Sequence, residues 1–248
     1  MWLDNSSQSL VDDFWRMSGV VETFPRDLER PLALALPIAL VSLPRLRLRD
    51  IETWLQQRGS CFEFQCRSRA IRGCLIAFRG QGLIFVDGAD PQDERRFTTA
   101  HEIAHFLVDY WLPRENALSR LGAKIAEVVD GLRDPTIRER VYALIGSIAI
   151  GVHTDLVERD RRLDDMSGTL WSLEDRADRV GLSLLAPPDA VLELVDLSPR
   201  DYGEREAEVT GVLRSCFGLP AAVARSYSHV LLAQSGRGPS WLETVGLR

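Results

Sequence analysis

Two histidines and a glutamate stand at a spacing that suits metal-assisted hydrolysis. His101, Glu102 and His105 form the pattern HExxH. On a helix, residues four apart leave the same face one turn apart, so both imidazoles can reach one zinc ion at about 2.0–2.1 Å. Glu102, beside the first histidine, is not placed to be a ligand with them. It can instead act as a general base towards a zinc-activated water, whose pKa falls towards about 7.

The alternative is that the two histidines are ordinary core or surface residues beside an incidental glutamate. The chain has only four histidines, so an HExxH pattern would rarely arise by chance. A strand, an acidic helix start and an apolar helix are also expected around it, in that order. The sequence therefore predicts one bound zinc ion, with another divalent metal such as manganese as the alternative.

A third ligand is needed, because catalytic zinc usually has three protein ligands and one open position. Glu174, on a helix expected over 172–185, is the candidate. Asp178 follows one turn later and could accept the free N–H of a metal-bound histidine, which would fix its tautomer. Small Ala177 and Gly181 would let this helix approach the HExxH helix closely. The residues alone leave open a solvated acidic helix start that merely favours the helix dipole.

The two remaining histidines, His153 and His229, stand outside any ligand-like pattern. His153, near Asp155, could be a ligand or an oxyanion donor, but we favour a hydrogen-bonded histidine at a helix end. A hydrolase needs a donor for the developing oxyanion. Tyr110, His153 and Arg96 are candidates, and the sequence does not choose among them.

The elements that position these residues indicate an α+β fold, mostly helical and zincin-like, with a small antiparallel sheet beside the HExxH helix. A helix is expected over 46–58, followed by strands over 61–66, 74–78 and 83–86, the last edging the substrate cleft. Asp90-Pro91 should open the HExxH helix, and Pro113 should end it. Further helices are expected over 116–132, from Asp134-Pro135, and over 204–216 and 220–234.

These elements suggest four regions. An N-terminal segment (1–45) packs on the core, and 46–112 holds the sheet and the HExxH helix. A helical insertion (113–168) follows, and 169–248 contains the third-ligand helix and a C-terminal helical region.

Composition narrows the class of protein. With 248 residues, 45% of them hydrophobic, the chain can bury a substantial core. A net charge of −6 argues against direct nucleic-acid binding, which relies on clustered Lys and Arg. The cysteines form no CxxC pair, so Cys61 and Cys66 are expected to be isolated buried thiols. The polar, acidic start and the short, proline-broken apolar run at 31–44 predict a cytoplasmic protein without a membrane span.

Two blocks of the sequence resemble the ImmA/IrrE family of gluzincin-like HExxH metallopeptidases. Residues 96–102 read Arg-Phe-Thr-Thr-Ala-His-Glu, almost the family's first block. Residues 174–187 resemble its E-x-x-A-N-x-F-A-x-x-L-L-M-P block. The departures there are Asp178 for Asn, Val180-Gly181 for Phe-Ala and Ala186 for Met. The resemblance covers about 45–110 and 170–235. The segment between His105 and Glu174 is longer than compact members would have.

The resemblance implies that the glutamate opening the second block, Glu174, is the third ligand. It also implies limited proteolysis of a helix-turn-helix transcriptional repressor in a stress or mobile-element response. A rival hypothesis is a metal-containing anti-repressor that sequesters a regulator without cleaving it. A zincin-like hydrolase for a non-peptide bond and an interaction protein without metal are further alternatives.

Overall fold

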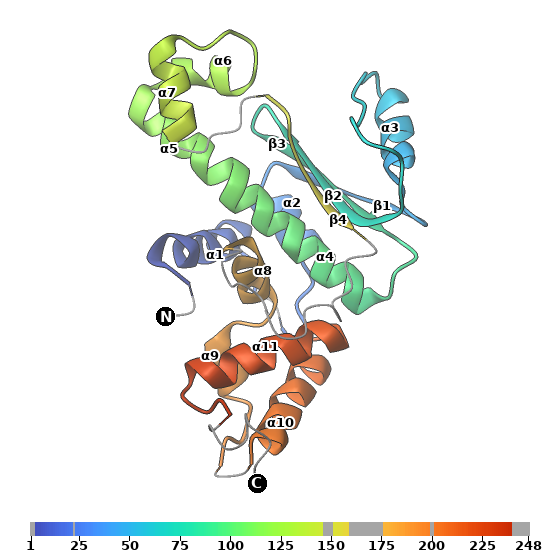
Figure 1. Cartoon of the computed structure of the whole chain (residues 1–248), viewed down its shortest axis with the longest axis vertical. Coiled ribbons are helices and arrows are strands. Elements are labelled where there is room, and N and C mark those ends of the chain that lie inside the picture. Colours follow the sequence, from blue (N-terminus) through green and yellow to red (C-terminus); the bar gives the residue numbers. More distant parts are fainter. Residues whose placement is uncertain (1–2, 22, 146–150, 159–175, 199–200, 240–248) are drawn as a thin grey trace.

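The computed structural model describes residues 3–21, 23–145, 151–158, 176–198 and 201–239. Glu174 and the start of its predicted helix lie outside these residues. The protein is α+β, as predicted, with one four-stranded sheet surrounded by helices (Figure 1). Helices lie on both faces of the sheet, and the longest continuous helical segment crosses one of these faces.

The sheet is mixed, whereas an antiparallel one was predicted. Its strands are β1 (Ile38–Leu43), β2 (Ile71–Phe78), β3 (Gln81–Asp87) and β4 (His153–Glu158), in the order β1-β3-β2-β4. The pairs β2–β3 and β2–β4 are antiparallel, but β1 pairs parallel with β3. Strand β1 was not predicted because it lies within the apolar run at 31–44. This run contains the end of a helix before Pro37 and the strand after it.

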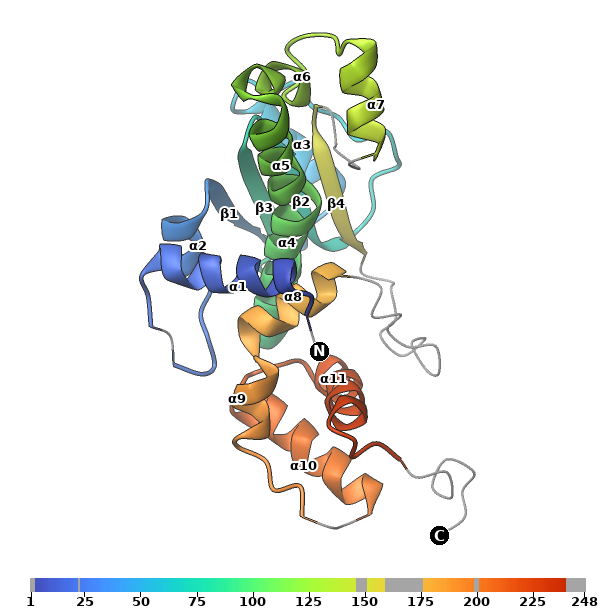
Figure 2. The same cartoon turned by 90° about the vertical axis from the view of Figure 1, so that its left-hand side faces the viewer.

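Two other expectations about strands are wrong. Residues 61–66 form no strand: Phe62 and Phe64 pack as a loop against the cluster under α3 (Leu48–Gln56), while Cys61 and Cys66 are exposed. The apolar–polar alternation of this loop imitates a half-buried strand. The strand expected to edge the cleft lies in β3, which is internal between β1 and β2. The described edges of the sheet are β1 and β4, on its opposite sides (Figure 2).

The HExxH helix does not end before Pro113. Helix α4 (Gln92–His105) runs into a π-helical turn, η1 (Phe106–Trp111), and then into α5 (Leu112–Leu121). Proline lacks an N–H, and its ring clashes with the carbonyl four residues earlier in an α-helix. The wider turn of η1 precedes Pro113, with the N–H of Leu112 bonded to the carbonyl of Leu107, so the rod continues through the proline.

The remaining helices cover the sheet and extend the molecule at both ends of the rod. They are α1 (Asn5–Ser18), α2 (Glu29–Ala35), η2 (Ala123–Ile125), α6 (Ala126–Val129), α7 (Ile137–Ile145), α8 (Arg176–Leu185), α9 (Pro188–Leu192), α10 (Tyr202–Ser215) and α11 (Ala221–Gln234). The helix predicted over 116–132 is broken at Gly122 into α5, η2 and α6. Helices α10 and α11 lie far from α6 and α7 in both views (Figures 1 and 2). The segment 113–168, expected to be helical, also supplies β4.

Each face of the sheet has its own buried cluster. Side chains such as Leu75, Ile84 and Val86 join those of α4, α8 and α11 in the main core. On the other face, Cys74 and Phe85 pack with residues of α3. Because side chains of a strand alternate between faces, these clusters show which residues of each strand face α4. Among the described residues, none of the helices is long and apolar enough to cross a bilayer.

The burial of the cysteines predicts their reactivity. Cys74 is buried, and burial raises the pKa of its thiol well above the usual value, whereas Cys61 and Cys66 are exposed. Because the thiolate is the nucleophile, we expect a maleimide to label Cys61 and Cys66 rapidly and Cys74 only after unfolding. Mass spectrometry of labelled peptides measures this order. Early labelling of Cys74 in the folded protein would contradict the packing of β2.

Candidate metal centre

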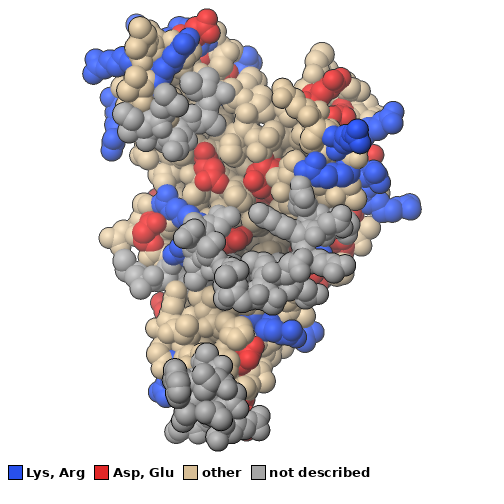
Figure 3. All heavy atoms as spheres, viewed as in Figure 1, with Lys and Arg blue, Asp and Glu red and all other residues tan. Residues whose placement is uncertain are grey.

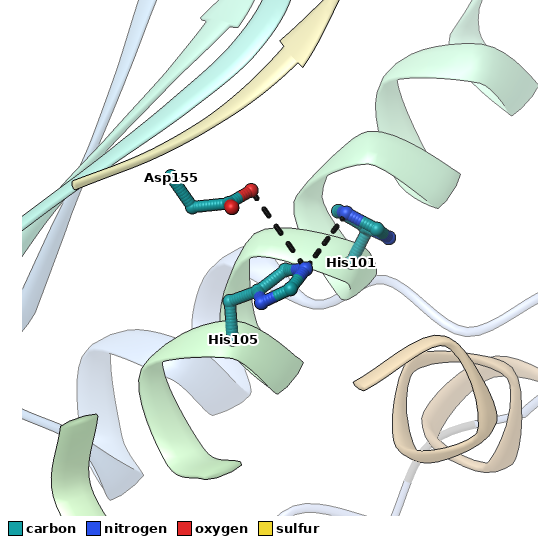
Figure 4. A group of neighbouring side chains, drawn as sticks. All are labelled: His101, His105 and Asp155. Atoms are coloured by element: carbon teal, nitrogen blue, oxygen red, sulfur yellow. Dashed lines mark hydrogen bonds and ion pairs between the residues drawn. The ribbon is translucent and has the colours of Figure 1, made fainter. Parts of the chain in front are cut away.

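Helix α4 and strand β4 bring together three side chains that could bind a metal ion. His101 and His105 leave one face of α4, and Asp155 comes from β4 (Figure 4). Leu156 packs in the cluster under α3, so alternation along β4 turns Asp155 towards α4. The pairing of Asp155 with Leu75 on β2 fixes its position along the sheet. A helix and a non-local strand pairing therefore hold the group.

The potential ligand atoms of these three residues converge. The Nε2 atoms of His101 and His105 are 3.0 Å apart, and Asp155 Oδ2 lies 3.7 Å from His105 Nε2. One ligand atom from each residue lies within 4.8 Å of those of the other two. Two imidazoles and a carboxylate are a donor set that zinc accepts. This His101/His105/Asp155 group could hold a metal ion.

Carboxylates behind the two rings set their tautomers. His101 Nδ1 bonds to Asp178 Oδ1 at 2.7 Å, and His105 Nδ1 bonds to Asp109 Oδ2 at 2.6 Å. A carboxylate oxygen accepts hydrogen bonds, so each neutral ring donates through Nδ1 and keeps its lone pair on Nε2. The two lone pairs then face each other across 3.0 Å. Such an arrangement is repulsive unless a proton on one ring makes it an N–H···N hydrogen bond or the pair shares a metal ion. Carboxylates bonded to Nδ1 are also the arrangement found behind metal-bound histidines.

Glu102 is fully buried next to this group. Neither carboxylate oxygen has a hydrogen-bond partner among the described residues. Burial raises the pKa of Glu102 well above its usual value, and the charge of Asp155 raises it further. An unpaired buried carboxylate is costly, and a nearby divalent cation would favour its ionised form. The orphaned oxygens and the donor set of the neighbouring residues therefore both fit a metal ion.

Two close approaches of the backbone make room for this arrangement. A Cβ on Gly73 of β2 would lie 2.5 Å from Thr98 Cγ2 and 2.8 Å from Glu102 Oε1. A Cβ on Gly181 of α8 would lie 3.2 Å from the carbonyl oxygen of Ala100. The first glycine lets Glu102 lie against the sheet. The second brings α8 close to α4, as its small residues predicted, and so brings Asp178 to His101.

The three candidate oxyanion donors are placed differently. Arg96 Nη1 donates to the Gly218 carbonyl at 3.0 Å, and the Tyr110 hydroxyl accepts from the Gly80 N–H at 2.6 Å. His153 stacks on the Tyr110 ring, and its buried Nε2 has no partner among the described residues. Burial lowers the pKa of His153, against the charges of Asp109 and Asp155. It lies on β4, not at the helix end that was expected.

Neither Asp155 nor Asp109 was predicted to be part of the site. Asp109 lies four residues after His105 on the helical rod, so the i, i+4 rule could have indicated its contact. Placing Asp155 at the site would have required the prediction of strand β4. The alternation of His153, Asp155 and Val157 with the residues between them is the only local signal of this strand. Glu174, predicted as the third ligand, is not among the described residues.

Acidic side chains gather around the two histidines. The carboxylates close to them are Glu102, Asp109, Asp155 and Asp178. In Figure 3, several acidic side chains lie in the middle of the face, and many of the Lys and Arg side chains lie towards its upper left and right. An excess of carboxylates beside neutral imidazoles favours a cation at this place.

Comparisons with family models, curated proteins and solved structures gave no match for this chain.

The contact between Gly73 and Glu102 gives a test of the packing. We expect Gly73→Ala to lower the free energy of unfolding by about 1–3 kcal/mol, because the added methyl group meets Thr98 and Glu102. Gly211→Ala on α10 is the matched control: its Cβ meets nothing within 4 Å, and it should stabilise the helix by about 0.5–1 kcal/mol. Urea denaturation of both variants measures the difference, and equal stability of the two would contradict the close approach.

Proposed function

We propose that this protein is a zinc-dependent endopeptidase with its reaction centre at His101, Glu102 and His105. The observation that carries the proposal is the pair of Nε2 atoms 3.0 Å apart, with a carboxylate bonded to the Nδ1 atom of each ring. The adjacent buried Glu102, without a partner among the described residues, adds a group with the chemistry of a general base. The resemblance of 96–102 to the ImmA/IrrE metallopeptidases supports the same assignment.

His101 and His105 would hold the ion, together with a carboxylate. Asp155 is the described carboxylate at this place, and Glu174 is the one that the family resemblance implies. When bound, zinc would polarise the scissile carbonyl and lower the pKa of a water molecule towards about 7. Asp178 and Asp109 would keep both rings in the tautomer that leaves Nε2 unprotonated.

Glu102 would move the proton in this reaction. It would accept a proton from the attacking water and deliver it to the nitrogen of the leaving amine. Its burial suits this role, because desolvation makes the carboxylate more basic than it is in water. His153 is the candidate donor for the oxyanion, because its Nε2 has no partner among the described residues and it lies on the same strand as Asp155.

Strand β4 would bind the substrate backbone. Among the described strands, β4 forms the edge of the sheet next to the metal centre, because its one neighbouring strand is β2. An extended peptide can add to such an edge through main-chain hydrogen bonds. We therefore propose β4 as the strand that binds the substrate, in place of the predicted strand at 83–86, which lies inside the sheet as part of β3.

The substrate that we propose is a helix-turn-helix transcriptional repressor, and a stress or mobile-element response is the setting. This part rests on the resemblance of 96–102 and 174–187 to the ImmA/IrrE family. A repressor would have to expose an extended segment to reach β4, so a linker between its folded parts is the expected cleavage site.

The identity of the third ligand is tested by zinc affinity. We expect Asp155→Ala to weaken zinc binding by at least about tenfold, because it removes a carboxylate from the His101/His105/Asp155 group. His101→Ala should weaken it more. Competition with a chelator of known affinity measures both. Asp189→Ala, an exposed change at the start of α9, is the control. A large loss in Glu174→Ala with none in Asp155→Ala would assign the third position to Glu174.

The role of Glu102 is tested by Glu102→Gln. We expect this change to keep stoichiometric zinc and to lower the cleavage of a quenched fluorescent peptide library by about 10²–10⁴-fold, because the general base is lost. Glu115→Gln, on an exposed part of α5, should cleave normally. Undiminished cleavage by Glu102→Gln would refute the peptidase mechanism. Zinc binding by the wild type without cleavage of the library or of a repressor would favour a sequestering role.

A further inference from the structure

Strand β1 presents an unpaired edge on the side of the sheet away from the metal centre. Its carbonyl groups at Pro37 and Leu43 accept from Gly82 and Gly88 of the β3 side, each at 2.9 Å. Peptide groups of a parallel strand face the neighbour at alternate residues. The N–H and C=O groups of Leu40 and Ser42 therefore point away from β3, and none of the described residues forms a strand beside them.

A cavity borders β1 on each face of the sheet. One, of about 670 Å³, lies on the α4 face between β1, α2 and the first turns of α4. The other, of about 680 Å³, lies on the α3 face around the start of β1. Both are lined by Ala33, Ile38 and Ala39. An added strand projects its side chains alternately to the two faces, so its alternate side chains would meet two different cavities.

The cavity on the α4 face offers positive charge. Arg95 and Arg96 line it, and Arg96 already donates to the Gly218 carbonyl. Arg95 Nε is buried without a hydrogen-bond partner among the described residues. The acidic residues of this cavity, Asp27 and Glu29, are exposed at its rim. A carboxylate entering beside β1 would pair with the Arg95 guanidinium by a charge-assisted hydrogen bond.

The cavity on the α3 face is apolar. Leu36, Leu55, Phe62 and Leu83 contribute to its lining, and they come from four separate segments of the chain. An aliphatic side chain placed there would lose contact with water on most sides. The two cavities therefore select different side chains on the two faces of one strand.

We propose that the open edge of β1 binds an extended segment of a partner protein in which acidic and apolar residues alternate. The segment adds as a fifth strand beside β1 and bonds to the peptide groups of Leu40 and Ser42. Its acidic side chains meet Arg95, and its apolar side chains meet the cavity on the α3 face. Because β1 and β4 are opposite edges of the sheet (Figure 2), this site is separate from the metal centre and does not depend on the proposed peptidase activity.

Fluorescence anisotropy with a short labelled peptide of alternating valine and glutamate tests the proposal on the whole chain. We expect saturable binding to the wild type and at least about tenfold weaker binding to Arg95→Glu. Leu40→Pro should weaken binding similarly, because proline removes the outward-facing N–H of this edge strand without breaking a hydrogen bond to β3. Arg225→Glu, an exposed change on α11, should bind as the wild type does.

Two further peptides keep the test independent of variant folding. A peptide with lysine in place of glutamate, and one N-methylated at alternate backbone nitrogens, should each bind at least about tenfold more weakly. Equal binding of the N-methylated peptide would overturn the strand addition, and equal binding of the lysine peptide would overturn the role of Arg95. Sedimentation that shows a dimer of the free protein, lost in Leu40→Pro, would also overturn the proposal, because a second copy would then occupy the edge.

Discussion

The site is organised around the close approach of two imidazole nitrogens. Asp178 and Asp109 each bond to the Nδ1 atom of one ring, and the two Nε2 atoms lie 3.0 Å apart. Exchanging tautomers would cost either ring its bond to a carboxylate, so the contact is relieved by a proton between the two Nε2 atoms or by a shared metal ion. Asp155 supplies a carboxylate close by, and a cation would lower the raised pKa of the buried Glu102.

Several local features of the fold serve this one arrangement. The π-helical turn η1 carries Asp109 behind His105 and allows the rod to pass Pro113. Gly181 lets α8 approach α4, so that Asp178 reaches His101. Gly73 leaves room for the Glu102 carboxylate against β2. Wider turns of helix are common at functional sites, and here the widened turn carries Asp109, which bonds to His105 Nδ1.

Local spacing explains which parts of the site could be predicted from the sequence. The i, i+4 relation of His101 and His105 on one helix needs no knowledge of the rest of the fold. The contact of Asp178 with a histidine was predicted from its position one turn after Glu174, and the small residues Ala177 and Gly181 predicted the close approach of the two helices. Asp155 could not be placed in this way, because β4 joins the sheet across a long stretch of chain and its short sequence alternates only weakly.

The errors in the fold have similar causes. Pro37 divides one apolar run into a helix and the strand β1, and the parallel pairing of β1 with β3 depends on contacts between distant residues. The loop at 61–66 alternates like a strand because Phe62 and Phe64 pack on α3. Pro113 predicts the end of a helix unless the preceding turn is known to widen.

We propose that one metal ion binds between the two imidazoles. X-ray absorption at the zinc edge, on protein loaded with one equivalent of zinc, tests this proposal. We expect two imidazole nitrogens and carboxylate or water oxygen at about 2.0–2.1 Å, with no sulfur ligand. A first shell with sulfur at about 2.3 Å, or one with no imidazole scattering, would contradict it.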